Sequence, residues 1–221
     1  MYTLFSGLYK SLTEKEEFFV LILGLDNAGK TTFLEAAKAK FGEKRTKSLI
    51  PLTRKYDGKN SDKAPLVNTS KITTTVGLNI GRIDTHGIRL NFWDLGGQEE
   101  LQALWDKYYA ECHAVIFTVD SHDRERVSES KAAFDAMISN SNITGVPLLV
   151  LANKQDLPES MGVREVKPIF QDNDEKIGNR ECMVLPTSGL TGDGVVEGIE
   201  WLIQCIQRNV VNRPTGNQDN D

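Results

Sequence analysis

The sequence has few cysteines and no long run of apolar residues. Its three cysteines are scattered through 221 residues and never form a C-x-x-C pair, which excludes a disulfide framework and a cysteine-based zinc site. This usage is typical of reduced thiols in a cytoplasmic protein. The apolar stretch from Phe18 to Leu23 ends at Gly24, short of the ~18 residues that a membrane-spanning helix needs. The N-terminus also lacks the basic region, apolar stretch and cleavage site of a secretory signal, so we expect no secretion.

An excess of positive charge is missing as well. The formal net charge is -5 at pH 7, which argues against nucleic acid as a partner because such a binder needs a concentrated basic face. With 39% hydrophobic and 26% charged residues, the composition is that of an ordinary globular protein. A chain of 221 residues fits one domain with a sizeable core.

Short apolar segments alternate with helical patterns along most of the chain. Strands are predicted at 18–24, 78–84, 88–94, 114–120, 146–152 and 183–186. Helices are predicted at 31–41, 99–110, 124–139, 163–170 and 194–209. The second and third strands are spaced for an antiparallel hairpin. The pattern predicts an α/β fold with a six-stranded, mostly parallel sheet and helices on both faces, which binds ligands beyond the carboxyl ends of its strands.

Three segments depart from this alternation. Residues 1–15 predict an N-terminal amphipathic helix, whose apolar face is formed by Met1, Leu4, Phe5, Leu8, Tyr9 and Leu12. Residues 43–71 interrupt the predicted domain 16–209 with a polar insert, in which eight Lys or Arg residues and two Asp residues lie within 44–71. The insert is interpreted either as a disordered, solvated loop or as a contact with an anionic membrane. The tail 210–221 is polar and predicted to be disordered.

One glycine-rich segment predicts phosphate binding. Its residues match G-x-x-x-x-G-K-[ST], and they are Gly24, Leu25, Asp26, Asn27, Ala28, Gly29, Lys30 and Thr31, with Thr32 completing the predicted set. The glycines let backbone N–H groups wrap around a phosphate, and the helix that follows adds its positive end. Lys30 can supply a charge to the outer phosphates, and the Thr31 hydroxyl can ligate Mg²⁺. This pattern alone does not choose between kinases, ATP-driven machines and GTPases.

The segment Asn153-Lys154-Gln155-Asp156 follows a predicted strand at the same edge of the sheet and resembles the guanine-reading N-K-x-D of small GTPases. The Asp156 carboxylate can accept two hydrogen bonds from guanine, whereas adenine presents an acceptor and no amine on that side. The alkyl part of Lys154 can lie on the base, and Asn153 can tie this loop to the phosphate loop. Ser188 and Gly189 follow the last strand, where that family places a backbone donor to the guanine oxygen.

The segment Trp93-Asp94-Leu95-Gly96-Gly97-Gln98 ends the hairpin. Asp94 is placed to hold Mg²⁺ through water, the backbone N–H of Gly97 can reach a γ-phosphate, and Gln98 can align the attacking water. Thr75 is the candidate for a threonine that closes over Mg²⁺ when the γ-phosphate is present. The predicted metal residues are thus Thr31, Thr75 and Asp94, and the predicted catalytic residues are Gln98, Lys30, Thr75 and Gly97.

The order and spacing of these motifs resemble the Ras-like small GTPases and, within them, the Arf/Arl branch. The segment from Trp93 to Glu99, the segment from Thr75 to Asn79, and Asp26 all look like Arf. The stretches 1–4, 21–35 and 105–113 are more similar still to the Arf-related Golgi members of this branch. The likeness covers residues 1–42 and 71–209.

The resemblance implies a monomeric small-GTPase fold that binds GTP or GDP with Mg²⁺ and hydrolyses GTP slowly. It also implies an exchange factor, a GTPase-activating protein, and an effector that contacts Leu78, Trp93 and Tyr108. The resemblance further implies a cytoplasmic protein that cycles onto Golgi or trans-Golgi membranes through its N-terminal helix and regulates trafficking there, with a membrane receptor as a candidate second anchor.

Some residues depart from the Arf pattern. Tyr2 replaces the glycine that classical Arfs need for myristoylation, Leu78 replaces a phenylalanine that partners touch, and Gly189 replaces an alanine. Trp93 is interpreted either as part of an exposed effector patch or as core, while His113 is assigned a structural role.

Two other functions stay open at this point. A P-loop kinase would leave the N-K-x-D segment and Gln98 idle, and no second-substrate arginines or lid are evident. A binding module locked with nucleotide is disfavoured by the presence of Gln98 and Thr75. Comparing the affinities for GTP and ATP distinguishes a GTPase from a P-loop kinase. Single-turnover hydrolysis distinguishes a GTPase from a module that only binds nucleotide.

Overall fold

The computed structural model describes residues 15–43, 65–171 and 174–213. The predicted N-terminal helix, except for its last residue, and most of the insert and tail lie outside the described residues. No helix within the described ranges is long and apolar enough to span a membrane.

A six-stranded sheet forms the centre of the domain, in the order β2-β3-β1-β4-β5-β6. Its strands are β1 Glu16–Leu23, β2 Leu78–Thr85, β3 Ile88–Leu95, β4 Ala114–Asp120, β5 Leu148–Asn153 and β6 Cys182–Pro186. The β2–β3 pair is antiparallel and every other pair is parallel. The predicted α/β fold with a mostly parallel sheet is therefore confirmed.

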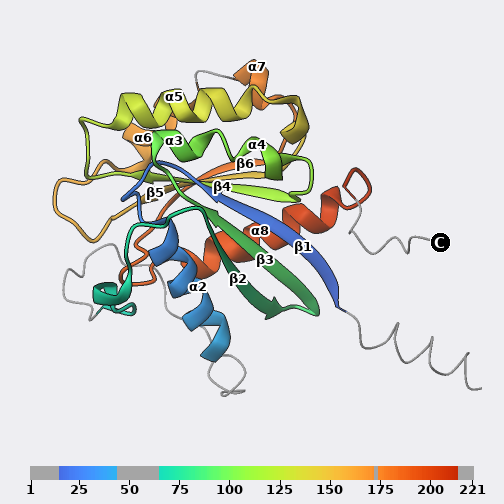
Figure 1. Cartoon of the computed structure of the whole chain (residues 1–221), viewed down its shortest axis with the longest axis horizontal. Helices are drawn as coiled ribbons and strands as arrows, with labels where there is room; N and C mark the ends of the chain where they lie inside the picture. The colour runs from blue at the N-terminus through green and yellow to red at the C-terminus, as the bar shows by residue number, and fades with distance from the viewer. Residues whose placement is uncertain (1–14, 44–64, 172–173, 214–221) are drawn as a thin grey trace, which may run out of the picture.

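Helices cover both faces of this sheet (Figure 1). One layer contains α2 Lys30–Glu43 and α8 Val195–Asn209; the other contains α3 Glu99–Gln102, α4 Asp106–Tyr109, α5 Val127–Ile138 and α6 Val163–Gln171, with the short α7 Asp174–Ile177 beside it. Strand side chains alternate between the two layers: Val20 and Ile22 pack with α2 and α8, whereas Leu21 and Leu23 pack with α5 and α6. This alternation gives the domain two hydrophobic cores that share one sheet.

The predicted continuous helix over 99–110 is wrong. The chain forms α3 and α4 instead, joined by a turn in which Leu104 N donates to Leu101 O and Trp105 N donates to Gln102 O, each at 3.0 Å. Trp105 explains the break, because its buried indole N–H donates to the carbonyl of Gly96 at 3.0 Å. That bond holds the segment after Gln98 against the glycine loop, in a path that one regular helix does not follow.

Parts of the insert and the tail pack against the domain. Val67 is buried, and Leu66 N donates to Leu190 O at 2.8 Å. At the other end, the Arg213 guanidinium donates to the carbonyls of Tyr109, Ala110 and Cys112. The disorder that the sequence suggests for the insert and tail thus does not extend to residues 65–71 and 210–213.

His113 has a structural role in this fold. Its ring is buried, and its Nδ1 accepts a hydrogen bond from Phe19 N at 3.1 Å. The ring also lies edge-on to Phe18, with 5.4 Å between the centroids. The structural interpretation made from the sequence is confirmed.

Candidate functional site

The glycine-rich loop lies between the end of β1 and the start of α2, at the carboxyl edge of the sheet. Gly24 has a φ of 130°, and a Cβ there would lie 2.2 Å from the carbonyl oxygen of Thr118 on β4. Gly29 has a φ of 92°, and a Cβ there would lie 2.3 Å from Asn153 Nδ2. Both positions require glycine because of backbone conformation and close approach together. The loop can therefore turn its N–H groups toward an anion while it is packed against two neighbouring strands.

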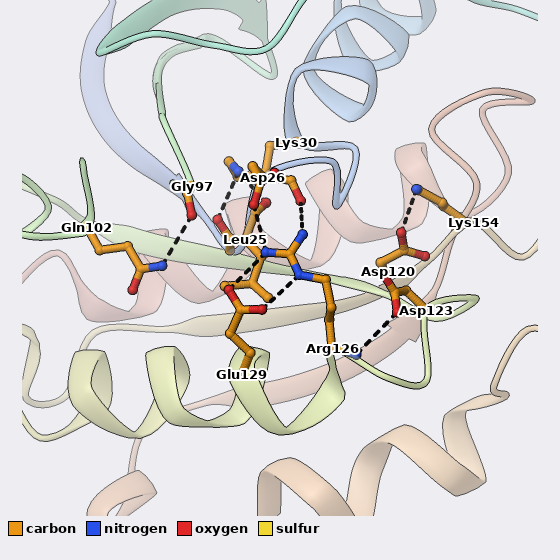
Figure 2. Close-up of polar contacts among 11 residues, drawn as sticks. Leu25, Asp26, Lys30, Gly97, Gln102, Asp120, Asp123, Arg126, Glu129 and Lys154 are labelled. Carbon is orange, nitrogen blue, oxygen red and sulfur yellow. Dashed lines mark hydrogen bonds and ion pairs between the residues drawn. The ribbon is translucent and has the colours of Figure 1, made fainter. Parts of the chain in front are cut away.

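Lys30 lies over this loop as a buried cation. Its ammonium donates to the carbonyls of Gly24 at 2.9 Å and Leu25 at 2.7 Å (Figure 2). Burial lowers the pKa of Lys30 to about 8, although the nearby Asp94 and Asp26 carboxylates act in the opposite direction. A phosphate at this loop would supply the counter-charge that the buried ammonium favours.

The three predicted metal residues come together beside Lys30. Thr31 Oγ1 donates to Asp94 Oδ2 at 2.6 Å and lies 2.7 Å from Thr75 Oγ1, so the Thr75 hydroxyl supplies the proton of that second bond. Asn79 Nδ2 also donates to Asp94 Oδ2, at 3.2 Å. This contact by Asn79 was not predicted from the sequence, because it depends on the pairing of β2 with β3, which sets Asn79 opposite Asp94.

Asp94 fits the requirements of a cation ligand. Its side chain is fully buried, burial raises its pKa, and its Oδ1 has no hydrogen-bond partner among the described residues. Such a carboxylate oxygen, next to two hydroxyls, suits a hard divalent cation that keeps waters or phosphate oxygens as its other ligands. Within the described part of the chain, no group of three His, Cys, Asp or Glu residues could hold a metal by itself.

The glycine loop after β3 packs directly on the phosphate loop. A Cβ at Gly97 would lie 2.3 Å from Asp26 N, Gly24 O and Leu25 C, all of them backbone atoms. Gly96 N donates to Gly77 O at 2.9 Å, which ties this loop to the segment that follows Thr75. The backbone around Gly97 is thus a wall of the phosphate site.

Gln98 is the residue just before α3, and its backbone carbonyl is bonded to that helix while its side chain is not held in place. The residue is exposed, and its side chain makes no capping hydrogen bond to the helix. Gln102, one turn further along, instead donates to Gly97 O at 3.2 Å. A role for Gln98 in aligning water therefore needs ordering by a ligand or a partner.

Asn153 joins three loops through one buried amide. Its Nδ2 donates to Ala28 O in the phosphate loop at 2.8 Å. Its Oδ1 accepts from Gly189 N at 3.0 Å and from Thr187 Oγ1 at 3.3 Å. The predicted tie between Asn153 and the phosphate loop is present, and the same side chain also fixes the loop after β6.

The other members of the predicted base-reading set are oriented by neighbours. Ser188 Oγ donates to Asp156 Oδ1 at 2.5 Å, and Lys154 Nζ donates to Asp120 Oδ2 at 2.5 Å. Asp156 is half-buried, so one carboxylate oxygen is fixed while the residue stays accessible. The contribution of Asp120 was missed, although its position at the end of β4, next to Asn153 at the end of β5, was a usable signal.

The predicted effector residues form a partly exposed apolar area beside the site. The rings of Trp93 and Tyr108 lie edge to face, with centroids 5.2 Å apart, and both are half-buried. Leu78 is 37% exposed, and Ile80, paired opposite Trp93, is 60% exposed. Trp93 also contacts Phe19, so it belongs to the surface and to the core at once.

Comparisons with known proteins agree with this geometry. The sequence pattern of the ADP-ribosylation factor family matches residues 4–55 and 62–206. ADP-ribosylation factor-related protein 1 of Bos taurus is 54% identical over 219 residues, which cover 99% of each chain. ADP-ribosylation factor-like protein 3 of Saccharomyces cerevisiae is 42% identical over 215 residues, covering 97% of this chain and 98% of its own.

A solved structure is also similar. The small GTPase Arl6 (BBS3) of Trypanosoma brucei, with the bound nucleotide analogue GppNp, aligns with a TM-score of 0.66 and 29% sequence identity. The alignment covers 87% of this chain and 98% of that one. The overall fold of this chain is therefore shared with a small GTPase that was solved with a nucleotide analogue.

Gly97→Ala should weaken GTP binding by at least about tenfold with a smaller effect on GDP, because overpacking against backbone costs roughly 1–3 kcal/mol and moves the loop off its neighbour. Titration with fluorescent analogues of both nucleotides measures this. Gly42→Ala is the matched control, since a Cβ there meets no atom within 4 Å. Equal GTP affinity in Gly97→Ala and wild type would contradict the assignment of Gly97 to the γ-phosphate wall.

Proposed function

This chain belongs to the ADP-ribosylation factor family and is a GTP-binding switch protein and GTP hydrolase, and from that premise we propose that it uses Mg²⁺ and regulates trafficking at Golgi or trans-Golgi membranes. The observation that supports the magnesium-dependent switch most strongly is the convergence of Thr31, Thr75 and Asp94 next to Lys30. These residues come from α2, the segment before β2, and β3, so a single ligand cluster can link the phosphate loop to two segments that change with the nucleotide.

The proposed roles follow from the contacts. Lys30 and the loop N–H groups would bind the phosphates, and the Thr31 hydroxyl and the free oxygen of Asp94 would hold the cation. Mg²⁺ would neutralise charge on the outer phosphates when bound. Thr75 would join the cation site only when the γ-phosphate is present, because its hydroxyl reaches the same cluster from a separate segment. Asn153, Lys154, Asp156, Ser188 and Gly189 form the guanine side of the site.

Hydrolysis is proposed to be slow without a partner. Gln98 is exposed and unsupported, and no arginine lies in the phosphate loop or in the segments around Thr75 and Gln98. An activating protein would then supply an arginine in trans and order Gln98. The apolar area of Leu78, Trp93 and Tyr108 is the proposed effector contact.

Membrane recruitment is proposed to depend on the N-terminal segment. The sequence predicts an amphipathic helix there, and one short helix without a lipid binds membranes only weakly. Stable anchoring normally takes two signals, so a second one is proposed beside the helix. The candidates are a receptor that reads an acetylated Met1 and the basic insert on anionic lipid.

Asp156→Asn should lower GTP affinity by at least about a hundredfold and improve binding of xanthosine triphosphate, because the amide cannot accept both guanine hydrogen bonds. Competition titration of both nucleotides against a fluorescent analogue measures the exchange of specificity. Asp106→Asn, at an exposed aspartate of α4, is the matched control. Unchanged GTP affinity in the Asp156 variant would show that another group reads guanine.

Gln98→Leu should keep the protein in the GTP state when an activating protein is present, because leucine cannot align water. Wild type alone should hydrolyse GTP at ~10⁻⁴–10⁻² s⁻¹, the range seen when an arginine finger is absent or in cis. Single-turnover assays with and without activator measure both rates. A Gln98→Leu protein as fast as activated wild type would refute the role of Gln98 and favour the view that the site only holds nucleotide.

Leu4→Ala/Phe5→Ala/Leu8→Ala should reduce membrane binding in a Gln98→Leu background, since it removes apolar area from the predicted helix face. Liposome flotation and Golgi targeting in cells are the measurements. Ser6→Ala/Ser11→Ala, on the polar face of the same predicted helix, should bind as the parent does. If the triple variant remains as membrane-bound as its parent, the helix does not carry recruitment.

A further inference from the structure

An arginine outside every predicted motif reaches the phosphate loop. Arg126, just before α5, donates from Nη2 to Asp26 Oδ1 at 2.8 Å and from Nη1 to Asp26 O at 3.4 Å (Figure 2). Its Nε and Nη2 also donate to the Glu129 carboxylate, at 2.8 and 2.9 Å. The backbone N–H of Arg126 donates to Asp123 Oδ1 at 3.2 Å. The guanidinium is therefore held from two sides while it faces the loop.

Asp26 is an unfavourable residue for a loop that binds anions. A Cβ at Gly97 would lie 2.3 Å from Asp26 N, so Asp26 stands at the end of the loop that faces Gly97 and the proposed γ-phosphate position. A carboxylate at this place repels a bound phosphate unless a cation compensates for it. The Asp26 and Arg126 side chains are 28% and 34% exposed, so solvent screens their charges only in part.

We propose that Arg126 is a positioning residue that neutralises Asp26 and thereby sets the preference of the site for GTP over GDP. This inference rests on the GTP-binding role of the loop. Arg126 touches neither Gly97 nor Gln98 in the described contacts, and it acts through Asp26. The residues Asp26, Arg126 and Glu129 carry one net negative charge together. Removing Arg126 leaves two negative charges beside the γ-phosphate end of the loop, and removing the Asp26 charge as well restores the original total.

This charge balance gives a rescue experiment. Arg126→Ala should release GTP about tenfold faster than wild type and GDP at most about threefold faster, since the repulsion is greatest at the γ-phosphate. Arg126→Ala/Asp26→Asn should return both rates to within about threefold of wild type. A role of Arg126 only in packing α5 would not be repaired by changing Asp26. Stopped-flow release of fluorescent GTP and GDP analogues, with Mg²⁺ present, gives the rates.

Arg124→Ala is the matched control, because Arg124 lies in the same loop but pairs with Glu165 of α6 at 3.0 Å. Its release rates should equal those of wild type. If Arg126→Ala does not fold, Asp26→Asn alone decides the question, and it should release GTP more slowly than wild type.

An unshifted ratio of GTP to GDP release in Arg126→Ala, or a double variant as fast as the single one, would overturn the proposal. GTP release from Asp26→Asn that is unchanged or faster would also overturn it. Wild-type protein that bound neither nucleotide would instead contradict the GTP-binding role, so the two failures are distinguishable.

Discussion

The site depends on the buried amide of Asn153. It is the one side chain among the described residues that donates to the phosphate loop and accepts from the loop after β6, and it does so from the end of a central parallel strand. Its amide occupies the space that a side chain at Gly29 would need. The glycine of the phosphate loop and the asparagine of the base loop therefore require each other. Removing the amide would leave buried polar partners on both loops, each costing about 1–3 kcal/mol.

A second connection runs from the phosphate loop to the hairpin. Asp94 at the end of β3 receives hydrogen bonds from Thr31 of α2 and Asn79 of β2. At the opposite end of the same strands, Arg89 of β3 bonds Glu17 of β1 and Asp84 of β2. Because both clusters depend on which residues stand opposite one another, they fix the register of β1, β3 and β2 together. Movement of the hairpin along β1 would break the bonds from Thr31 to Asp94 and from Arg89 to Glu17, whereas the bonds within the hairpin would move with it.

The sequence was sufficient for those features that rest on local pattern. Short apolar segments predicted all six strands, and the spacing of Gly24, Gly29, Lys30 and Thr31 predicted the phosphate loop. It was insufficient where a side chain acts across the fold. Arg126 lies 100 positions after Asp26, and nothing in either neighbourhood relates the two.

The broken helix after Gln98 has the same origin. Its residues have helical spacing, but the bond from Trp105 to Gly96 is tertiary and overrides that preference. The predictions for the N-terminal helix and for most of the basic insert concern residues outside the described ranges, and they stay predictions. The structure thus differs from the sequence-based predictions at places where segments distant in the sequence contact one another.

The contacts of Arg213 extend the folded unit beyond its last helix. Its guanidinium donates hydrogen bonds to the carbonyls of Tyr109, Ala110 and Cys112, which belong to the end of α4 and the turn before β4. Any shortened or tagged form of the protein should therefore keep residues 210–213 and join its fusion partner after them. A boundary drawn at the end of α8 would remove the donor to those three carbonyls and leave the turn between α4 and β4 without this support.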